Sequence, residues 1–463
     1  MFARFSSFHR LSRTPTSRGV TLREAAWAPA APLSSGLAWM ALALALRLAA
    51  CAPSATAPSP TPSPPPSASP TSPIATLTPA PSDTPDLATQ RRTLRLWLVE
   101  PLASDGAVPA VLLEQLQAFR ALNPNVTFDV RVKLASGTDG VLQVLRSTLS
   151  VAPAALPDLV LLDRADLVSA ASAGQVQQLE GRLAEELVSD FFPVAREMGA
   201  VNGELYGAAY VLDAQHLVFR QAAFKTPPAR LADILSGPAP YLFPAGNSDT
   251  IVGQYLAGGG RLVDDEGRPV VDEGPLLAAL RFYEQGIKAN VIPLTTLEFD
   301  HPDDYIEDFL DGMSSVVNIN ASTYLRRRSE MPNVGVARIP APETPSVTVV
   351  TGWSWAMVTT DPDRQVLVVE LLNWLLQPER QGAFSRASRV LPSQHTALQI
   401  WGDEAYSAFA ESLLADAVLR PASAERASTA QALQEALRDV LLERYTAEEA
   451  VSAAASRFDT HDS

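Results

Sequence analysis

The spacing of apolar residues changes repeatedly between a strand-like and a helix-like pattern over the first part of the folded chain. Residues 93–99 and 158–162 are short, mostly apolar runs, and residues 126–132 alternate apolar with polar side chains. Both patterns are typical of β-strands. Residues 109–122 and 141–149 instead repeat apolar side chains every three or four positions, which predicts helices. The resulting β-α-β-α-β order predicts a mainly parallel sheet covered by helices.

The C-terminal third of the chain is predicted to be helical. Apolar residues recur at helical spacing in four segments, 366–376, 378–387, 404–414 and 424–444. The apolar stripe of the last segment consists of Ala430, Leu433, Leu437, Val440 and Leu441. One such stripe predicts a helix with one face on a core and the other in solvent.

The N-terminal segment has the pattern of an export sequence. Its first part is basic, and residues 36–46 form an apolar run that is too short to span a bilayer. The residues that follow, Leu48-Ala49-Ala50-Cys51, resemble the bacterial lipoprotein motif, and Cys51 is the only cysteine of the chain. The resemblance implies that residues 1–50 are a signal peptide and that Cys51 is lipidated.

A proline-rich stretch separates this segment from the rest of the chain. Residues 52–85 contain 12 Pro, 7 Ser and 6 Thr in 34 positions. Such a composition cannot bury a core and favours extended polyproline II. We therefore expect residues 51–90 to be a lipidated tether and residues 91–460 to be the folded domain.

Composition and charge narrow the function. The chain has 463 residues, of which 47% are hydrophobic and 19% charged, and its net charge is -15. So acidic a protein repels phosphate backbones, which argues against a nucleic-acid partner. A single cysteine excludes an intrachain disulfide framework and a metal site built from several thiolates.

The sequence carries little that points to catalysis. None of the five histidines has the paired spacing of a metal site, and no nucleophile elbow or phosphate-binding glycine loop is present. We therefore expect neither a metal nor a cofactor, and no enzyme. Paired carboxylates meet in space and not in sequence, so a surface-anchored glycoside hydrolase stays open as an alternative.

Taken in order, several segments resemble the extracellular solute-binding proteins of ABC transporters, the family that includes maltose-binding protein. These segments are 157–163 (PDLVLLD), 203–210 (GELYGAAY), 312–320 (GMSSVVNIN), 349–358 (VVTGWSWAMV) and 378–381 (PERQ). The resemblance spans about residues 93–457. It implies an α/β fold of the periplasmic-binding-protein type (type II), in which discontinuous lobes are joined by hinge crossings.

The resemblance also implies a division of the chain and a function. Lobe one is expected at about 93–210 plus 313–358, and lobe two at about 211–312 plus 359–457. The implied protein is a monomer that is lipid-anchored at the extracytoplasmic face of the membrane and delivers a small solute, a sugar or polyol, to ABC permease subunits. A ligand-sensing domain without transport is a further alternative.

Open α/β sheets bind ligands at the carboxyl ends of their strands, and solute clefts favour aromatic walls with a few fixed polar groups. Strand ends and crossing segments together offer eight candidate ligand-binding residues: Glu100, Asp163, Arg164, Tyr210, Asn320, Tyr324, Trp353 and Trp355. Trp353 and Trp355 lie two apart, so in a regular strand both would face the cleft or both the core, whereas a bulge would separate them. Sugar-binding relatives often have tryptophan where this chain has Ser322, which leaves a smaller solute or a polyol open.

Overall fold

The computed structural model describes residues 91–103, 106–238, 240–343 and 345–458. The predicted signal peptide, the lipidated Cys51 and the proline-rich tether all lie outside the described residues. Within these residues no helix is both long and apolar enough to cross a membrane.

The strands of the described part form one large curled sheet and one small hairpin. The main path of the sheet runs in the order β2 (Val126–Lys133), β1 (Arg92–Val99), β3 (Leu159–Leu162), β10 (Val349–Met357), β6 (Gly207–Arg220), β8 (Val316–Asn320) and β7 (Tyr241–Leu242). Three shorter strands join this path: β9 (Val334–Ala337), β11 (Leu391–Pro392) and β12 (Val418–Leu419). The hairpin pairs β4 (Ala200–Val201) with β5 (Glu204–Leu205).

The predicted β-α-β-α-β unit is present at the start of the domain. Strands β1, β2 and β3 are mutually parallel through β1, and they alternate with α1 (Ala110–Leu122) and α2 (Val141–Val151). All four residues of β3 are buried, as expected for a strand covered by helices on both faces.

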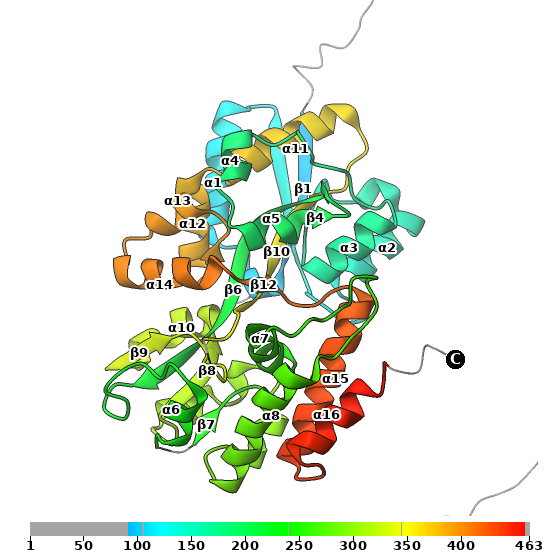
Figure 1. Cartoon of the computed structure of the whole chain (residues 1–463). Coiled ribbons are helices and arrows are strands. Elements are labelled where there is room, and N and C mark those ends of the chain that lie inside the picture. Colours follow the sequence, from blue (N-terminus) through cyan, green and yellow to red (C-terminus); the bar gives the residue numbers. More distant parts are fainter. Residues whose placement is uncertain (1–90, 104–105, 239, 344, 459–463) are drawn as a thin grey trace, which may run out of the picture. The chain divides into compact units, whose positions relative to one another are not determined.

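Strand β6 is long enough to belong to both halves of the sheet. Its first half pairs with β10 and β11, and its second half, from Gln215 to Arg220, pairs with β8 and β9. Figure 1 shows β6 passing from the region of β10 to that of β8. The strand therefore crosses between two separate groups of helices.

The helices of the first group are α1–α5 and α11–α14. Besides α1 and α2 they comprise α3 (Arg164–Ser172), α4 (Glu185–Ser189), α5 (Pro193–Gly199), α11 (Pro362–Leu375), α12 (Pro378–Ala387), α13 (His395–Gln399) and α14 (Glu404–Leu414). Their buried apolar residues form one hydrophobic cluster with those of β1, β2 and β3.

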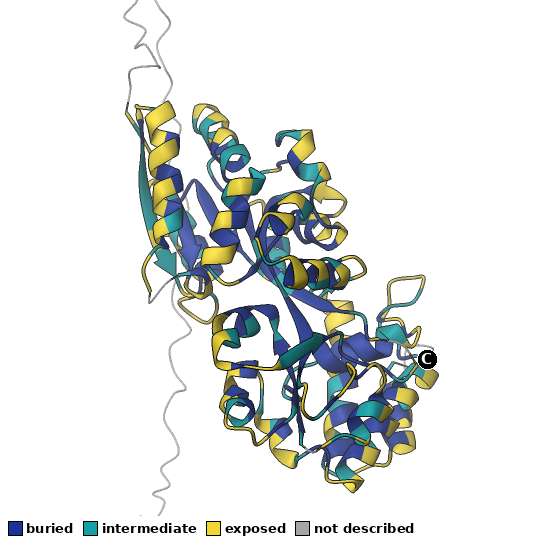
Figure 2. Ribbon diagram, turned by 90° about the vertical axis from the view of Figure 1, so that its left-hand side faces the viewer, coloured by how far each residue is buried: buried dark blue, intermediate teal, exposed yellow. Residues whose placement is uncertain are grey.

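The remaining helices are counted with the other half, although α10 contributes Ala321 and Leu325 to the first cluster. They are α6 (Leu231–Leu235), α7 (Asp249–Ala257), α8 (Glu273–Lys288), α9 (Ile306–Leu310), α10 (Ala321–Arg327), α15 (Ala424–Leu441) and α16 (Ala447–Ala455). The predicted stripe of α15 is buried in the second cluster along its whole length. Figure 2 shows that the helices bury the face turned toward the strands and expose the other.

These clusters divide the chain differently from the predicted lobe boundaries. The segment 362–414, which was assigned to lobe two, packs in the first cluster, whereas Val316, which was assigned to lobe one, lies in the second. The reason is long-range packing onto α1: the ring of Trp374 meets that of Phe119 edge-on at 5.9 Å, and Gln115 Nε2 donates to the carbonyl oxygen of Arg380 at 2.8 Å. The chain thus returns to the second cluster only at β12.

Candidate ligand-binding site

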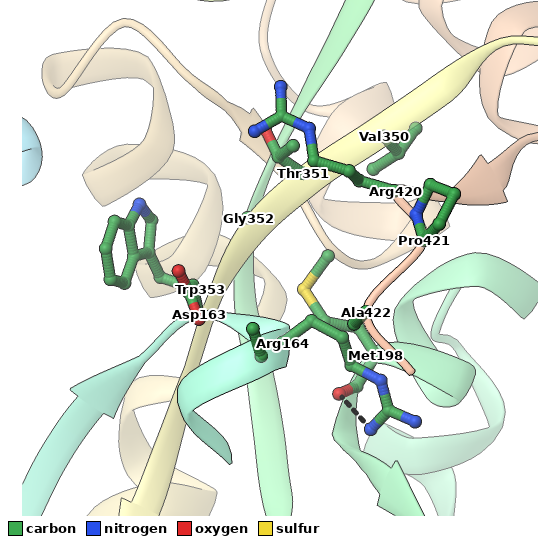
Figure 3. Close-up of a pocket in the computed structure, with 11 residues that line it drawn as sticks. Asp163, Arg164, Met198, Val350, Thr351, Gly352, Trp353, Arg420, Pro421 and Ala422 are labelled. Atoms are coloured by element: carbon green, nitrogen blue, oxygen red, sulfur yellow. Dashed lines mark hydrogen bonds between the residues drawn. The ribbon is translucent and has the colours of Figure 1, made fainter. Parts of the chain in front are cut away.

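A pocket of about 200 Å³ lies where β3, β10 and the segment after β12 meet (Figure 3). Its walls come from four parts of the chain: Asp163, Arg164 and Ala165 at the start of α3, Met198 of α5, Val350, Thr351, Gly352 and Trp353 of β10, and Arg420, Pro421 and Ala422 after β12. The sheet thus brings together residues that are more than 250 positions apart in the sequence.

Asp163 both caps a helix and lines the pocket. It is the N-cap of α3, and its Oδ1 accepts a hydrogen bond from the backbone N–H of Asp166 at 2.8 Å. Among the described residues its Oδ2 has no hydrogen-bond donor. Burial, with the nearby Asp163 charge, raises the pKa of Asp166 to about 6. The pocket therefore presents one carboxylate oxygen that is free to accept a hydrogen bond from a ligand.

Arg164 is the next residue in the chain, but its guanidinium bonds to backbone carbonyl groups at the end of α5. Its Nη1 donates to the backbone carbonyl oxygens of Met198, at 3.3 Å, and of Ala200, and Figure 3 shows the guanidinium directed toward Met198. Burial lowers the pKa of Arg164. This side chain fixes α5 against α3, and part of it lines the pocket.

Arg420 lines the opposite side of the pocket and forms an ion pair with the buried side chain of Asp249. Its Nε lies 2.9 Å from Asp249 Oδ1 and 3.1 Å from Oδ2, and its Nη2 also contacts Oδ2. The Asp249 side chain is only 3% exposed and sits in the first turn of α7. Although burial lowers the pKa of Arg420, the Asp249 charge and hydrogen bonds outweigh it, and the pKa is raised.

A second buried carboxylate lies on the crossing strand beside the pocket. Asp213 pairs in register with Thr351, and both its oxygens are held by Ser322, through the backbone N–H at 2.9 Å and through Oγ at 2.7 Å. Burial raises the pKa of Asp213. Ser322 thus serves to anchor α10 to β6.

The two tryptophans of β10 have different environments. Trp353 is half-buried and lines the pocket, whereas Trp355 is fully buried. The pairing of β10 with β6 shifts in register between Trp353 and Ser354, so an irregularity falls between the two rings. Trp355 packs against Tyr210, with ring centroids 5.9 Å apart, and Tyr210 is also fully buried. Both side chains are therefore core residues here, in place of the predicted contact with ligand.

The other predicted residues lie away from this pocket. Glu100 follows β1 as expected, but it is exposed on a 3-10 turn (Glu100–Leu102). Asn320 ends β8 and is the N-cap residue of α10, where its Oδ1 is buried without a partner among the described residues. Tyr324 is half-buried on α10 and packs 5.0 Å from the ring of Tyr406. The structure thus brings together Asp163, Arg164 and Trp353 of the eight candidates.

Several residues in or beside the pocket were not predicted from the sequence. Asp213 is the single acid in the apolar run 208–218, and a lone carboxylate in a buried strand is a readable indication of a polar role. Arg420 follows the two apolar residues of β12 and precedes a proline. This pattern is typical of a short strand, but only helices were predicted in this part of the chain. Gly352 is required by close packing, because a Cβ there would lie 2.2 Å from the carbonyl oxygen of Val211.

A buried histidine lies further along the same crossing strand. His216 is fully buried, its Nε2 is 3.3 Å from the hydroxyl of Tyr406, and its ring meets Tyr324 and Phe409 edge-on at 5.4 Å each. Burial lowers the pKa of His216 from 6.5 to about 4. The folded protein therefore keeps this ring neutral where an unfolded chain would protonate it.

We expect this histidine to make the protein less stable in mild acid. Between the two pKa values only the unfolded state binds the proton, so the free energy of unfolding falls as the pH is lowered, by about 2 kcal/mol at pH 5 from this group alone. Asp166 acts in the opposite direction, because its raised pKa favours the folded state as the pH falls below about 6. Denaturation curves of the wild type and His216→Phe at about pH 7.5 and pH 5 separate the two, and an identical pH dependence in both proteins would contradict this assignment.

The arrangement suits binding of a polar solute. The residues that line this small space include an indole, a carboxylate, the hydroxyl of Thr351 and the guanidinium of Arg420, beside apolar side chains. Within the described residues no group of three or more His, Cys, Asp or Glu side chains could hold a metal ion. The chemistry on offer is hydrogen bonding and stacking.

Comparison with known proteins agrees with this geometry. A family described as bacterial extracellular solute-binding protein matches residues 114–411, more than half of the chain. No curated protein sequence is significantly similar. The sugar-binding protein MalE of Xanthomonas citri is similar in structure, with a TM-score of 0.66 at 20% identity over 80% of this chain and 96% of its own.

Two further structures show the same fold. Maltose-bound MalE3 of T. maritima has a TM-score of 0.63 at 18% identity, covering 79% of this chain and 99% of its own. A solute-binding protein of an ABC transporter from Thermotoga lettingae, bound with alpha-D-tagatose, has a TM-score of 0.61 at 18% identity, covering 80% and 99%. The predicted two-lobed fold is confirmed, and since the family consists of binding proteins, so is the prediction that the chain is not an enzyme. The chain belongs to the bacterial extracellular solute-binding proteins.

Proposed function

We propose that this protein is a lipid-anchored, monomeric receptor that captures a sugar or polyol between its lobes and delivers it to the permease of an ABC importer. The observation that supports it most directly is the pocket at the carboxyl end of β3, where Trp353 and Asp163 lie beside each other (Figure 3). An indole stacks on the apolar face of a sugar ring while a carboxylate accepts hydrogen bonds from its hydroxyl groups. The similar structures that carry maltose or tagatose support this class of solute.

The dimensions of the pocket favour a small solute. Its volume of about 200 Å³ lies below the range of about 300 to 1,000 Å³ that is usual for drug-sized ligands. One aromatic side chain lines it, and Ser322 bonds to Asp213 where a second stacking ring would be needed. We therefore place a monosaccharide or polyol ahead of a maltodextrin.

A thermal-shift screen of the full chain against sugars, polyols, amino acids and polyamines tests the proposal. Binding to the folded state alone raises its stability by RT ln(1 + [L]/Kd), or about 2.7 kcal/mol at a hundredfold excess over Kd. A large shift with one class of sugar or polyol is the expected result. Shifts confined to amino acids or polyamines, or no shift across the set, would count against it.

Asp163→Ser provides a sharper test of the site. Serine can still cap α3, so the fold is retained, while the charged acceptor is lost from the pocket. A hydrogen bond to a charged group is worth about 1.5 to 3 kcal/mol, so we expect the Kd for the solute found in the screen to rise by about 10- to 100-fold.

The matched control is Asp361→Ser, which makes the same change at the N-cap of α11, outside the pocket. Calorimetric titration of both variants measures the effect. Equal Kd values for Asp163→Ser and the wild type would place the solute elsewhere.

The anchor is tested separately. If Cys51 carries the lipid, Cys51→Ser is expected to move the protein from the membrane fraction to the soluble extracytoplasmic fraction. Retention of the variant in the membrane fraction would contradict lipidation of this residue, and it would leave the solute-binding proposal untouched.

A further inference from the structure

A second pocket of about 200 Å³ shares no residue with the ligand-binding site. It lies between the 3-10 turn η5 (Arg328–Glu330) after α10, the end of α12 and the loop before α14. Its polar lining consists of three arginines and one carboxylate: Arg328, Arg386, Arg389 and Asp403. The pocket therefore concentrates positive charge on a protein whose net charge is -15.

Both oxygens of the single carboxylate in this pocket, Asp403, already have partners. Asp403 is the N-cap of α14, where its Oδ1 accepts from the N–H of Tyr406 at 3.3 Å, and its Oδ2 pairs with Arg328. Arg386 and Arg389 are exposed, and neither has an ion pair among the described residues. Two guanidinium groups three positions apart thus lack a protein counterion on the same pocket.

The backbone of Arg389 gives an independent indication. Its φ is 57°, in the left-handed region, and the N–H of Val390 bonds to the carbonyl oxygen of Ser385 at 3.0 Å, as in the glycine-terminated ends of helices. Glycine adopts this conformation without strain, whereas arginine does so at a cost. What arginine supplies at this position, and glycine does not, is a guanidinium at the rim of the pocket.

The wall behind these charges is rigid. Trp401 is 4% exposed, and its Nε1 donates to Ser385 Oγ at 3.1 Å, so the indole holds the end of α12 in place. Arginine forks match the oxygens of phosphate and carboxylate groups, often in pairs of hydrogen bonds. We propose that this pocket binds a small oxyanion, a phosphate or phosphate-like group, between Arg386, Arg389 and Arg328.

Inorganic phosphate is the first probe, titrated into the full chain by calorimetry at constant ionic strength, with chloride as the balancing anion. We expect saturable binding in the wild type. Arg389→Gly is expected to weaken it at least about tenfold, the loss of one charge-assisted hydrogen bond, while its melting temperature without phosphate equals or exceeds that of the wild type. Loss of binding therefore could not be ascribed to unfolding.

Two variants control for other causes. Glu443→Gly relieves the same left-handed conformation, at a φ of 53°, outside this pocket, and Arg438→Gln removes one positive charge from the exposed face of α15. Both are expected to bind phosphate as the wild type does. Equal binding in Arg389→Gly and the wild type would overturn the proposal, as would the absence of saturable binding of both inorganic phosphate and the phosphate ester that serves as the second probe.

A second titration uses glycerol phosphate to distinguish a free ion from a phosphate group on a larger molecule. Binding of both probes, lost together in Arg389→Gly, assigns the pocket to the phosphate group itself. Binding of the ester alone, also lost in Arg389→Gly, assigns it to a phosphate carried by a larger molecule. Ester binding that survives this substitution would overturn the proposal.

Discussion

Replacing Arg364 with methionine is expected to lower the free energy of unfolding by about 3 to 5 kcal/mol, because it leaves a buried carboxylate without its counterion. The partner is Asp158, whose side chain is 4% exposed. Arg364 Nε donates to Asp158 Oδ1 at 2.8 Å, its Nη2 contacts Oδ2, and Nη2 also donates to the carbonyl oxygen of Thr93 at 2.6 Å. The fork ties α11 to the first strands of the sheet.

The Arg364 variant also tests whether the stability of the fold can be lowered without changing the affinity for the solute. Asp158 and Asp163 lie at opposite ends of β3, so we expect Arg364→Met to keep the Kd for the solute while its denaturation midpoint falls. Arg281→Met removes an exposed pair with Glu448, and its midpoint should change much less. A loss no larger than that of Arg281→Met would show that water or a rearranged side chain satisfies Asp158.

The elements of the fold were largely predictable because they depend on short-range patterns. The buried run of β3 and the stripe of α15 follow from spacing alone, and both are observed. The lobe boundaries depend on which distant surface a helix finds. Nothing local to α11 indicates that Trp374 packs on Phe119, about 250 positions earlier, so the sequence does not show which cluster this helix joins.

In the candidate site, too, the residues set by short-range patterns could be predicted and those set by long-range packing could not. Asp163 and Trp353 could be placed because the end of a parallel strand and the strand beside it are local features. Tyr210 and Trp355 could not be distinguished from ligand-facing residues, since their burial depends on each other and on Phe384, whose ring centroid lies 4.7 Å from that of Tyr210. Arg420 reaches the pocket only through the return of the chain at β12.

That return of the chain is held by an ion pair whose loss should affect both stability and binding. Arg420→Met is expected to lower the free energy of unfolding by about 3 to 5 kcal/mol, since Asp249, only 3% exposed, would keep its charge without a partner. Its remaining polar neighbour, Gln215 Nε2, is 3.5 Å from Oδ2 and replaces little of the lost interaction. The exposed pair of Arg457 with Glu435 provides the control, Arg457→Met.

A double-mutant cycle separates the ion pair from the packing of the long arginine side chain. Removing both charges, in Arg420→Met with Asp249→Leu, is expected to recover most of the stability lost in Arg420→Met, because a buried pair replaced by apolar groups is often neutral. Binding should behave differently: Arg420 lines the pocket, so the double variant is expected to regain its fold and still bind the solute more weakly than the wild type. Denaturation curves and calorimetric titration of the four proteins measure both quantities. Full recovery of affinity would show that Arg420 acts only by linking α7 to the segment after β12. Recovery of stability without recovery of affinity would identify Arg420 as a ligand contact.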